Sequence, residues 1–105
     1  MSNNYCEVEI TDPERWNLSY TNKKKTYMKM HIDLWSDNDF LSLCNDRKIM
    51  FLWMLNASST LNSPSVKIYI EPFQATFKCS VHEIKKNIYT LDSLNIIKIT
   101  GFKLS

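Results

Sequence analysis

The sequence predicts an α+β fold in a single domain, and three kinds of local pattern indicate it. Residues 5–10 and 26–35 alternate apolar and polar side chains, which is the period of a half-buried strand. Residues 66–70 and 96–100 are short runs rich in Ile, Val and Tyr, which also favour strands. Residues 81–94 instead place apolar side chains three and four positions apart, which indicates an amphipathic helix. Strands and helices are therefore expected to alternate along the chain.

The length and composition allow one domain with a short N-terminal extension. A chain of 105 residues is long enough for one hydrophobic core but not for two. We expect residues 1–35 to form an N-terminal β extension, in which strands 5–10 and 26–35 pair as a β-hairpin. Residues 36–105 should form the domain proper. The single Gly argues against glycine-rich loops that cradle phosphates, and neither a GxGxxG nor a GxxxxGK motif is present.

Three features of the sequence indicate a cytoplasmic protein that does not enter a membrane. Residues 1–5 lack the basic start and the apolar run of a signal peptide. The longest apolar run, Ile49–Leu55, is far shorter than the ~20 residues that span a bilayer. The three cysteines, Cys6, Cys44 and Cys79, are odd in number and widely spaced, which favours a reducing compartment over a disulfide framework.

Two helices are expected between residues 36 and 56. Asp37 and its polar neighbours can cap a short helix that begins near Phe40. Asn45 and Asp46 can then cap a longer helix, Arg47–Asn56, whose apolar residues extend nearly all the way round it. Such a helix is either fully buried or covered by a partner. Residues 57–65 combine Ser, Thr, Asn and Pro, and this composition predicts a loop.

The next part of the chain predicts a pair of helices joined by a tight turn. The strand at residues 66–70 leads into a short helix, Phe73–Lys78, with Pro72 in its first turn. Ser80 can cap the longer helix at residues 81–94 with its hydroxyl oxygen. Lys78 stands in the turn at a place where Gly is common.

The end of the chain predicts a wing. Asn95 suits the left-handed backbone position that closes a helix. Residues 96–100 then form a strand, Gly101 can turn the chain, and residues 102–104 begin a return strand. The element order after residue 46 is therefore helix, strand, helix, turn, helix, strand and turn. This order predicts a winged helix-turn-helix, and the fold class is α+β with an added N-terminal β-hairpin.

The longer helix of the pair has the composition of a DNA-recognition helix. Val81, Ile84, Ile88 and Leu91 share one helical face and would fix the helix on the core. The opposite face carries cationic, imidazole and amide groups, which are the donors that duplex DNA contacts use, although it has no Arg to read guanine. The predicted DNA-binding residues are Lys78, Ser80, His82, Lys85, Lys86, Asn87, Tyr89, Lys98 and Lys103, with Thr76 as a further phosphate donor.

The distribution of charge agrees with this prediction. Residues 1–46 carry five basic and eight acidic side chains, a net charge of −3, whereas residues 47–105 carry eight basic and three acidic ones, a net charge of +5. A basic C-terminal half is the electrostatic pattern of a nucleic-acid-binding protein, although ordinary surface charge gives the same count. Lys23, Lys24 and Lys25 can form a secondary phosphate contact or a solvated loop, and the sequence leaves both open.

Several runs of residues are typical of one protein class. They are residues 35–41, 47–52, 68–70 and 80–84, and they continue to Leu91 and to Ile96–Ile97. On these runs the segment 31–99 resembles the N-terminal winged-helix domains of phage and plasmid replication initiators, among them the DnaD-like replisome organisers. The resemblance implies a role in DNA replication initiation or regulation, with binding of double-stranded DNA, formation of a homodimer, or both. A replication-machinery protein is a further partner that it implies.

No pattern in the chain predicts catalysis or a bound cofactor. Cys79 and His82 form a lone C-x-x-H pair, whereas a structural zinc site needs four ligands. Cys44 has no neighbouring His that would activate it as a nucleophile. Asp37 and Asp39 are placed as helix caps. We therefore expect no enzyme activity, no metal, no cofactor and no small-molecule substrate.

The alternative function is a winged-helix protein–protein interaction or oligomerisation module. In that case the apolar helix Arg47–Asn56 or the acidic N-terminal strands would bind the partner. A phage-encoded inhibitor of a host protein belongs to the same class. Self-association without DNA binding would favour this alternative, and the basic C-terminal half favours DNA.

Overall fold

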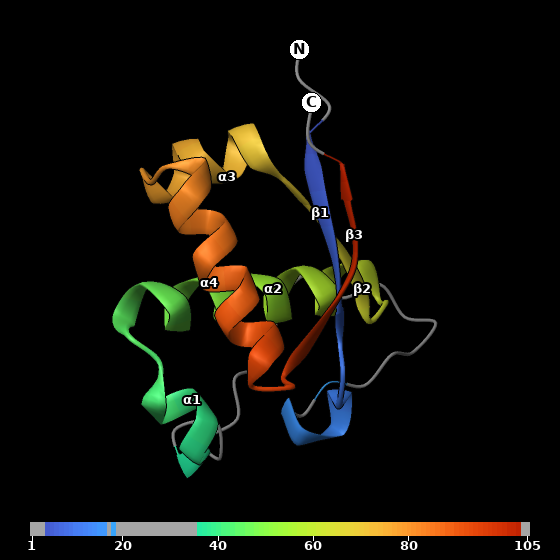
Figure 1. Cartoon of the computed structure of the whole chain (residues 1–105). Coiled ribbons are helices and arrows are strands. Elements are labelled where there is room, and N and C mark those ends of the chain that lie inside the picture. The colour runs from blue at the N-terminus through green and yellow to red at the C-terminus, as the bar shows by residue number, and fades with distance from the viewer. Residues whose placement is uncertain (1–3, 17, 19–35, 104–105) are drawn as a thin grey trace.

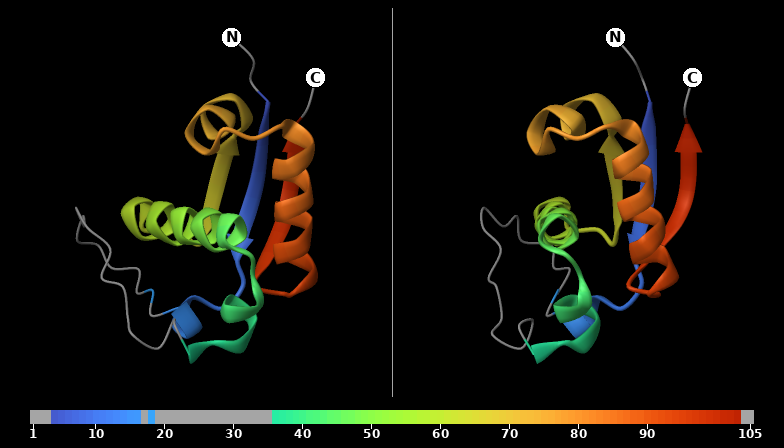
Figure 2. Two further views of the ribbon diagram at one scale, coloured as in Figure 1. Left: turned by 90° about the vertical axis from the view of Figure 1, so that its left-hand side faces the viewer. Right: turned by 60° about the vertical axis from the view of Figure 1, so that its left-hand side comes forward.

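The computed structural model describes residues 4–16, 18 and 36–103, which form an α+β fold. Three strands make one antiparallel sheet, and the three longer helices lie against one of its faces (Figure 1; two further views in Figure 2). In chain order the described elements are β1 (Tyr5–Ile10), the 3-10 helix η1 (Pro13–Trp16), α1 (Asn38–Ser42), α2 (Asn45–Leu61), β2 (Ser65–Tyr69), α3 (Ile70–Phe77), α4 (Val81–Ser93) and β3 (Ile97–Lys103).

The first strand of the chain is the central strand of the sheet. β1 pairs antiparallel with β2 on one side and with β3 on the other, so that the strand order is β2-β1-β3. Its residues alternate as expected for a strand with one covered face, and Cys6, Val8 and Ile10 are buried under the helices. The opposite side chains Glu7 and Glu9 lie on the uncovered face of the sheet. The predicted strand at residues 5–10 is therefore confirmed.

The predicted N-terminal β-hairpin is wrong in its pairing. A strand has two hydrogen-bonding edges, and β2 and β3 occupy both edges of β1. No edge of β1 is therefore left for the predicted second strand of the hairpin. Residues 26–35 themselves lie outside the described residues. Local alternation correctly identified a strand at residues 5–10, but it carried no information about which distant segments would pair with that strand.

The helix α2 is longer than the sequence suggested. It runs to Leu61 rather than to Asn56, so the predicted loop at residues 57–65 is wrong over its first half. Ser58 and Ser59 continue the buried face of the helix, and the Ser58 hydroxyl donates to the Ser63 carbonyl oxygen at 2.6 Å. Because this bond satisfies the hydroxyl inside the core, a polar segment can extend a buried helix.

The helix pair α3–α4 follows the prediction, with shifted ends. α3 begins at Ile70, three residues before the expected start, and Pro72 lies in its first turn. The Ser80 side chain caps α4 by accepting from the Glu83 N–H at 3.1 Å, as predicted. Asn95 adopts the predicted left-handed conformation with φ 62°.

The strand β3 runs straight through the position where the sequence predicted a turn. Gly101 lies inside the strand, so the turn and the return strand at residues 102–104 are wrong for the described part of the chain. The register of β3 shifts beside Glu7 and Val8, which leaves Thr100 as an extra residue. The Thr100 hydroxyl donates to the Glu7 carbonyl oxygen at 3.1 Å, which holds this irregularity in place.

One core joins the sheet to the helices. Its largest fully buried side chains include Phe40 of α1, Phe51 of α2, Ile68 of β2 and Ile88 of α4. Trp16 of η1 packs edge-on against Phe51, with ring centroids 4.7 Å apart. Among the described helices, none is both long enough and apolar enough to cross a membrane.

An ion pair connects η1 to the start of α1. The Arg15 guanidinium donates from Nε to Asp37 Oδ2 at 2.7 Å and from Nη2 to Asp39 Oδ2 at 2.8 Å. The Asp37 carboxylate also caps α1 by accepting from the backbone N–H groups of Asp39 and Phe40. The hydrogen bond from Arg15 is the main reason that the pKa of Asp37 lies below its ordinary value.

We expect Asp37→Ala to lower the free energy of unfolding by about 1–2 kcal/mol, because it removes the cap of α1. Asp37→Asn keeps a capping oxygen and loses only the ion pair, so it should cost less than about 1 kcal/mol. Urea unfolding at neutral pH measures both values, and equal losses for the two variants would contradict the capping role.

The same pair of proteins gives a pH test. Because the folded-state pKa of Asp37 is lowered, its ionic stabilisation is present above the ordinary pKa of 3.8. It is lost as the pH falls below that value and through the lower folded-state pKa. The wild type and Asp37→Asn should therefore converge in stability at acid pH, and a constant difference between them would contradict the ion pair.

Candidate nucleic-acid interface

Two hydrogen bonds to backbone carbonyl oxygens stabilise the turn between α3 and α4. Lys78 ends α3 in the left-handed conformation, with φ 50° and ψ 48°, and its N–H donates to the Gln74 carbonyl oxygen at 2.7 Å. The Gln74 side chain donates to the Cys79 carbonyl oxygen at 3.4 Å, and Ser80 then begins the next helix. A lysine thus occupies the position where the turn commonly has a Gly, and its side chain is exposed to solvent.

The position of α4 is fixed by contacts along its apolar side and by one hydrogen bond near its C-terminal end. Ile84, Ile88 and Leu91 are fully buried against the core. At the end of the helix, the Asp92 carboxylate accepts from the Ile99 N–H of β3 at 3.1 Å. These contacts hold the helix rigidly beside β3 (Figure 1) and determine which side chains it presents to solvent.

The outward face of α4 carries His82, Glu83, Lys86 and Tyr89, all of which are exposed. We call these four residues the outer α4 face. Lys85 is half-buried at its flank. The Tyr89 ring is 53% exposed and lies 5.7 Å from the Phe102 ring of β3, at an interplanar angle of 30°. The face therefore combines one Lys, one imidazole and one phenol with a carboxylate.

Asn87 does not belong to this face, although the sequence placed it there. Its side-chain oxygen accepts from Arg47 Nε of α2 at 2.9 Å, and its side-chain nitrogen donates to Met50 Sδ at 3.4 Å. The amide is half-buried and joins α4 to α2. Asn87 follows Ile84 by three positions and precedes Leu91 by four, so the helical period itself places it beside the apolar face.

The two lysines expected on a wing lie on the far side of the sheet. Lys98 is paired with Glu9 and Lys103 with Tyr5, and these partners belong to the uncovered face. Because α4 packs on the other face, the structure does not bring Lys98 and Lys103 together with the outer α4 face. Lys23, Lys24 and Lys25, the predicted secondary contacts, lie outside the described residues.

The remaining predicted donors lie near the turn. Ser80 is exposed, and its oxygen already accepts the capping bond from Glu83. The Thr76 hydroxyl donates to the Pro72 carbonyl oxygen at 2.9 Å, so a phosphate would have to displace that bond. Lys78 and the outer α4 face thus remain as the exposed candidate groups of the helix pair.

Two of the described cysteines, Cys6 and Cys79, lie in environments that disfavour a thiolate. Burial raises the pKa of the Cys6 thiol to about 12, with a smaller contribution from Glu7. Burial also raises the pKa of Cys79, and the carboxylates of Glu83 and Asp46 add to this shift. Within residues 4–16, 18 and 36–103, no three His, Cys, Asp or Glu side chains are grouped so that they could hold a metal ion.

We expect Asn87→Ala to lower the free energy of unfolding by about 1–3 kcal/mol, because it leaves Arg47 without its acceptor in a half-buried site. Lys86→Ala, one position earlier on the same helix, should change it by less than about 0.5 kcal/mol. Urea unfolding of the two variants distinguishes the buried contact from the exposed face. Equal stability of both variants would mean that the Arg47–Asn87 bond contributes nothing.

Comparisons of this chain with protein-family models, with curated proteins and with solved structures found no match. The function of the chain is therefore inferred from its own geometry and chemistry. Its strongest candidate site is the turn at Lys78 together with the outer α4 face.

Proposed function

We propose that this chain is a winged helix-turn-helix protein that binds duplex DNA through α4. The observation that carries the proposal is the exposure pattern of the α3–turn–α4 unit. The apolar side of α4 is buried against the core, whereas Lys78, His82 and Lys86 are exposed to solvent. A helix fixed in this way fits the major groove, where side chains reach phosphates and base edges.

The order of elements supports the finer fold assignment. The succession α2, β2, α3, α4 and β3 is that of a winged helix-turn-helix. One difference is topological, because the strand beside β3 is β1 from the start of the chain rather than a return strand after Gly101. The sheet beside the recognition helix is therefore completed by a different segment, while the helix-turn-helix itself keeps its expected order.

The charges favour binding that is weak and mainly to the DNA backbone. Between Ile70 and Ser93 the cations Lys78, Lys85 and Lys86 are balanced by Glu71, Glu83 and Asp92. Of these acids, Asp92 accepts a hydrogen bond from the β3 backbone. Two or three phosphate contacts are typical of non-specific binding, with a dissociation constant of about 10⁻⁵ M near physiological salt.

The sequence selectivity of this interface should be low. With Asn87 bonded to α2, the outer α4 face retains Lys86, His82 and the Tyr89 hydroxyl as its donors toward base edges. One Lys can reach guanine, but the described part of α4 offers no planar, two-pronged donor such as Arg. Affinity should therefore depend more on salt than on base sequence.

The biological setting is a second part of the proposal and depends on the resemblance of segment 31–99. We infer a phage or plasmid protein that acts in replication initiation or regulation, with a homodimer or a replication-machinery protein as partner. An interaction module remains the second candidate. It is favoured by the exposed apolar side chains of α2, where Ile49 is 52% and Leu61 is 63% exposed.

The experiment is fluorescence anisotropy with an AT-rich mixed-sequence duplex at about 50 and about 200 mM salt, where binding to phosphates weakens steeply. We expect the double variant Lys85→Ala with Lys86→Ala to weaken binding to every duplex and to reduce the salt slope by about two units. Lys67→Gln is the matched control, because Lys67 lies on β2, at the opposite edge of the sheet from β3.

The result separates the two candidate functions. Unchanged DNA affinity in the double variant, or an equal loss in the Lys67→Gln control, would remove α4 from the interface. No binding at low salt would overturn the DNA proposal and favour the interaction module. Sedimentation of the same samples then shows whether the chain associates with itself.

A further inference from the structure

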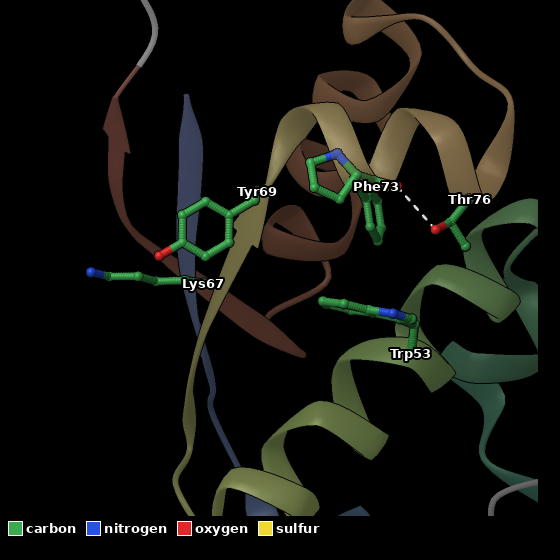
Figure 3. A pocket seen from close by; sticks show the side chains of 6 residues that line it. Trp53, Lys67, Tyr69, Phe73 and Thr76 are labelled. Atoms are coloured by element: carbon green, nitrogen blue, oxygen red, sulfur yellow. Dashed lines mark hydrogen bonds between the residues drawn. The ribbon is translucent and has the colours of Figure 1, made fainter. Parts of the chain in front are cut away.

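A small cavity lies at the outer edge of β2, away from α4. It has a volume of about 180 Å³ and opens between β2, α2 and α3 (Figure 3). Trp53 of α2 and Phe73 of α3 line it, with ring centroids 5.1 Å apart. Lys67 and Tyr69 of β2 border its other side, and Pro72 and Thr76 of α3 complete it. The cavity has room for one branched or aromatic apolar side chain.

The backbone beside this cavity is unpaired in the described part of the chain. The bonds Ile10 N–H to Pro64 carbonyl and Ile70 N–H to Asn4 carbonyl delimit the β1–β2 ladder. Because an antiparallel ladder uses every second pair, Val66 and Ile68 bond to β1, and the residues between them point outward. The N–H and C=O of Lys67 and the N–H of Tyr69 therefore face away from the sheet.

These outward groups form a short edge that an extended chain could pair with. Ser65 contributes only its carbonyl oxygen, because its N–H already donates to the Ser63 hydroxyl at 3.2 Å. Lys67 can exchange two hydrogen bonds with a partner residue, and Ser65 and Tyr69 can add one each. Backbone hydrogen bonds of this kind select an extended polypeptide rather than a nucleic acid or a small molecule.

The side chain of Lys67 adds a charge preference. Its ammonium lies 4.9 Å from the centroid of the Tyr5 ring. Glu7 is its cross-strand neighbour on β1, but among the described residues no carboxylate, Glu7 included, forms an ion pair with Lys67. Tyr69 is 50% exposed beside it. An acidic side chain directly opposite Lys67 would therefore be favoured in a cross-strand pair.

We propose that the outer edge of β2 binds an acidic, extended segment of a partner protein by adding an antiparallel strand to the sheet. The partner residue opposite Lys67 is Glu or Asp. Because successive residues of a strand face opposite sides, the residue before it lies opposite Ile68 and places an apolar side chain in the cavity that Trp53 and Phe73 line. The occupant is thus defined as an apolar residue followed by an acidic one.

A second copy of this chain fits the edge less well. If two β2 strands paired over their full length, the two-fold axis would pass through Lys67, so that Lys67 of one copy would oppose Lys67 of the other. Like charges directly opposite each other destabilise an antiparallel pair. The charge of the edge therefore favours an acidic partner over self-pairing.

The probe is the blocked hexapeptide Thr-Tyr-Leu-Glu-Thr-Thr, added to the full chain labelled with ¹⁵N and followed by amide chemical shifts. We expect binding with a dissociation constant of about 1 mM or tighter. The largest shifts should occur at Lys67 and Tyr69 and at the indole of Trp53. Two control peptides should bind at least tenfold more weakly: one has Lys in place of Glu, and the other carries an N-methyl group on the Glu amide, which blocks its bond to the edge.

The protein variant Lys67→Pro tests the same edge from the other side. Proline lacks a backbone N–H, and the N–H of residue 67 forms no hydrogen bond to β1. Edge strands tolerate Pro at such positions. We expect at least a tenfold loss of peptide affinity, with unchanged thermal unfolding and unchanged duplex DNA affinity. Lys67→Gln keeps the N–H and should lose only the smaller contribution of charge. The N-methylated peptide keeps the test valid even where Lys67→Pro alters folding.

Several outcomes overturn the proposal. Equal binding of the N-methylated peptide, shifts confined to other surfaces, or no binding at several millimolar peptide would each exclude strand addition at β2. Tighter binding of octathymidylate at the same residues would assign the edge to single-stranded nucleic acid. Self-association abolished by Lys67→Pro would assign it to a second copy of the chain.

Discussion

The structure depends on the placement of β1 between two strands that lie far along the chain. Tyr5–Ile10 supplies hydrogen bonds to Ser65–Tyr69 on one edge and to Ile97–Lys103 on the other. Its inward side chains Cys6, Val8 and Ile10 are fully buried and form the middle of the covered sheet face. Without β1, both β2 and β3 would lose their only partner among the described strands, and the surface on which α4 rests would not exist.

This placement has consequences for folding as well as for stability. Pairing β1 with β3 closes a loop that includes nearly the whole chain. The conformational entropy lost in this closure is offset only once the contacts between β1 and β3 have formed. The helix pair α3–α4 is local by contrast, and its cap, turn and buried stripe involve neighbouring residues. The helices of the candidate DNA interface are therefore specified by neighbouring residues. Their orientation on the sheet depends instead on the β1–β3 pairing, which joins the two ends of the described chain.

That distinction explains what the sequence could predict. The strand at residues 5–10, the cap at Ser80, the helix after it and the left-handed Asn95 all depend on signals within a few residues, and all are confirmed. The end of α2 was missed because the buried hydroxyl of Ser58 is satisfied by Ser63, which composition alone does not reveal. The predicted turn at Gly101 failed because pairing with β1 extends the strand through it.

The same reasoning applies to the candidate site. The helical period identified the exposed residues His82 and Lys86, and it could also have placed Asn87 beside the buried face. The positions of Lys98 and Lys103 could not be predicted, because both depend on the choice of β1 as partner and the face of Lys103 also depends on the irregularity at Thr100. The cavity at Trp53 was also beyond prediction, since it joins residues from α2, β2 and α3.

The sheet order gives the two proposed surfaces a defined relation. The order β2-β1-β3 places β2 and β3 at opposite edges, and α4 packs against β3. A peptide added to β2 would extend the sheet away from α4, so it would not compete with DNA for space. A partner that also contacts DNA elsewhere on its surface would add to the weak binding expected of α4, because the charges between Ile70 and Ser93 are balanced. Weak backbone binding by α4 and strand addition at β2 would then reinforce each other through effective concentration, without a change of shape in either site.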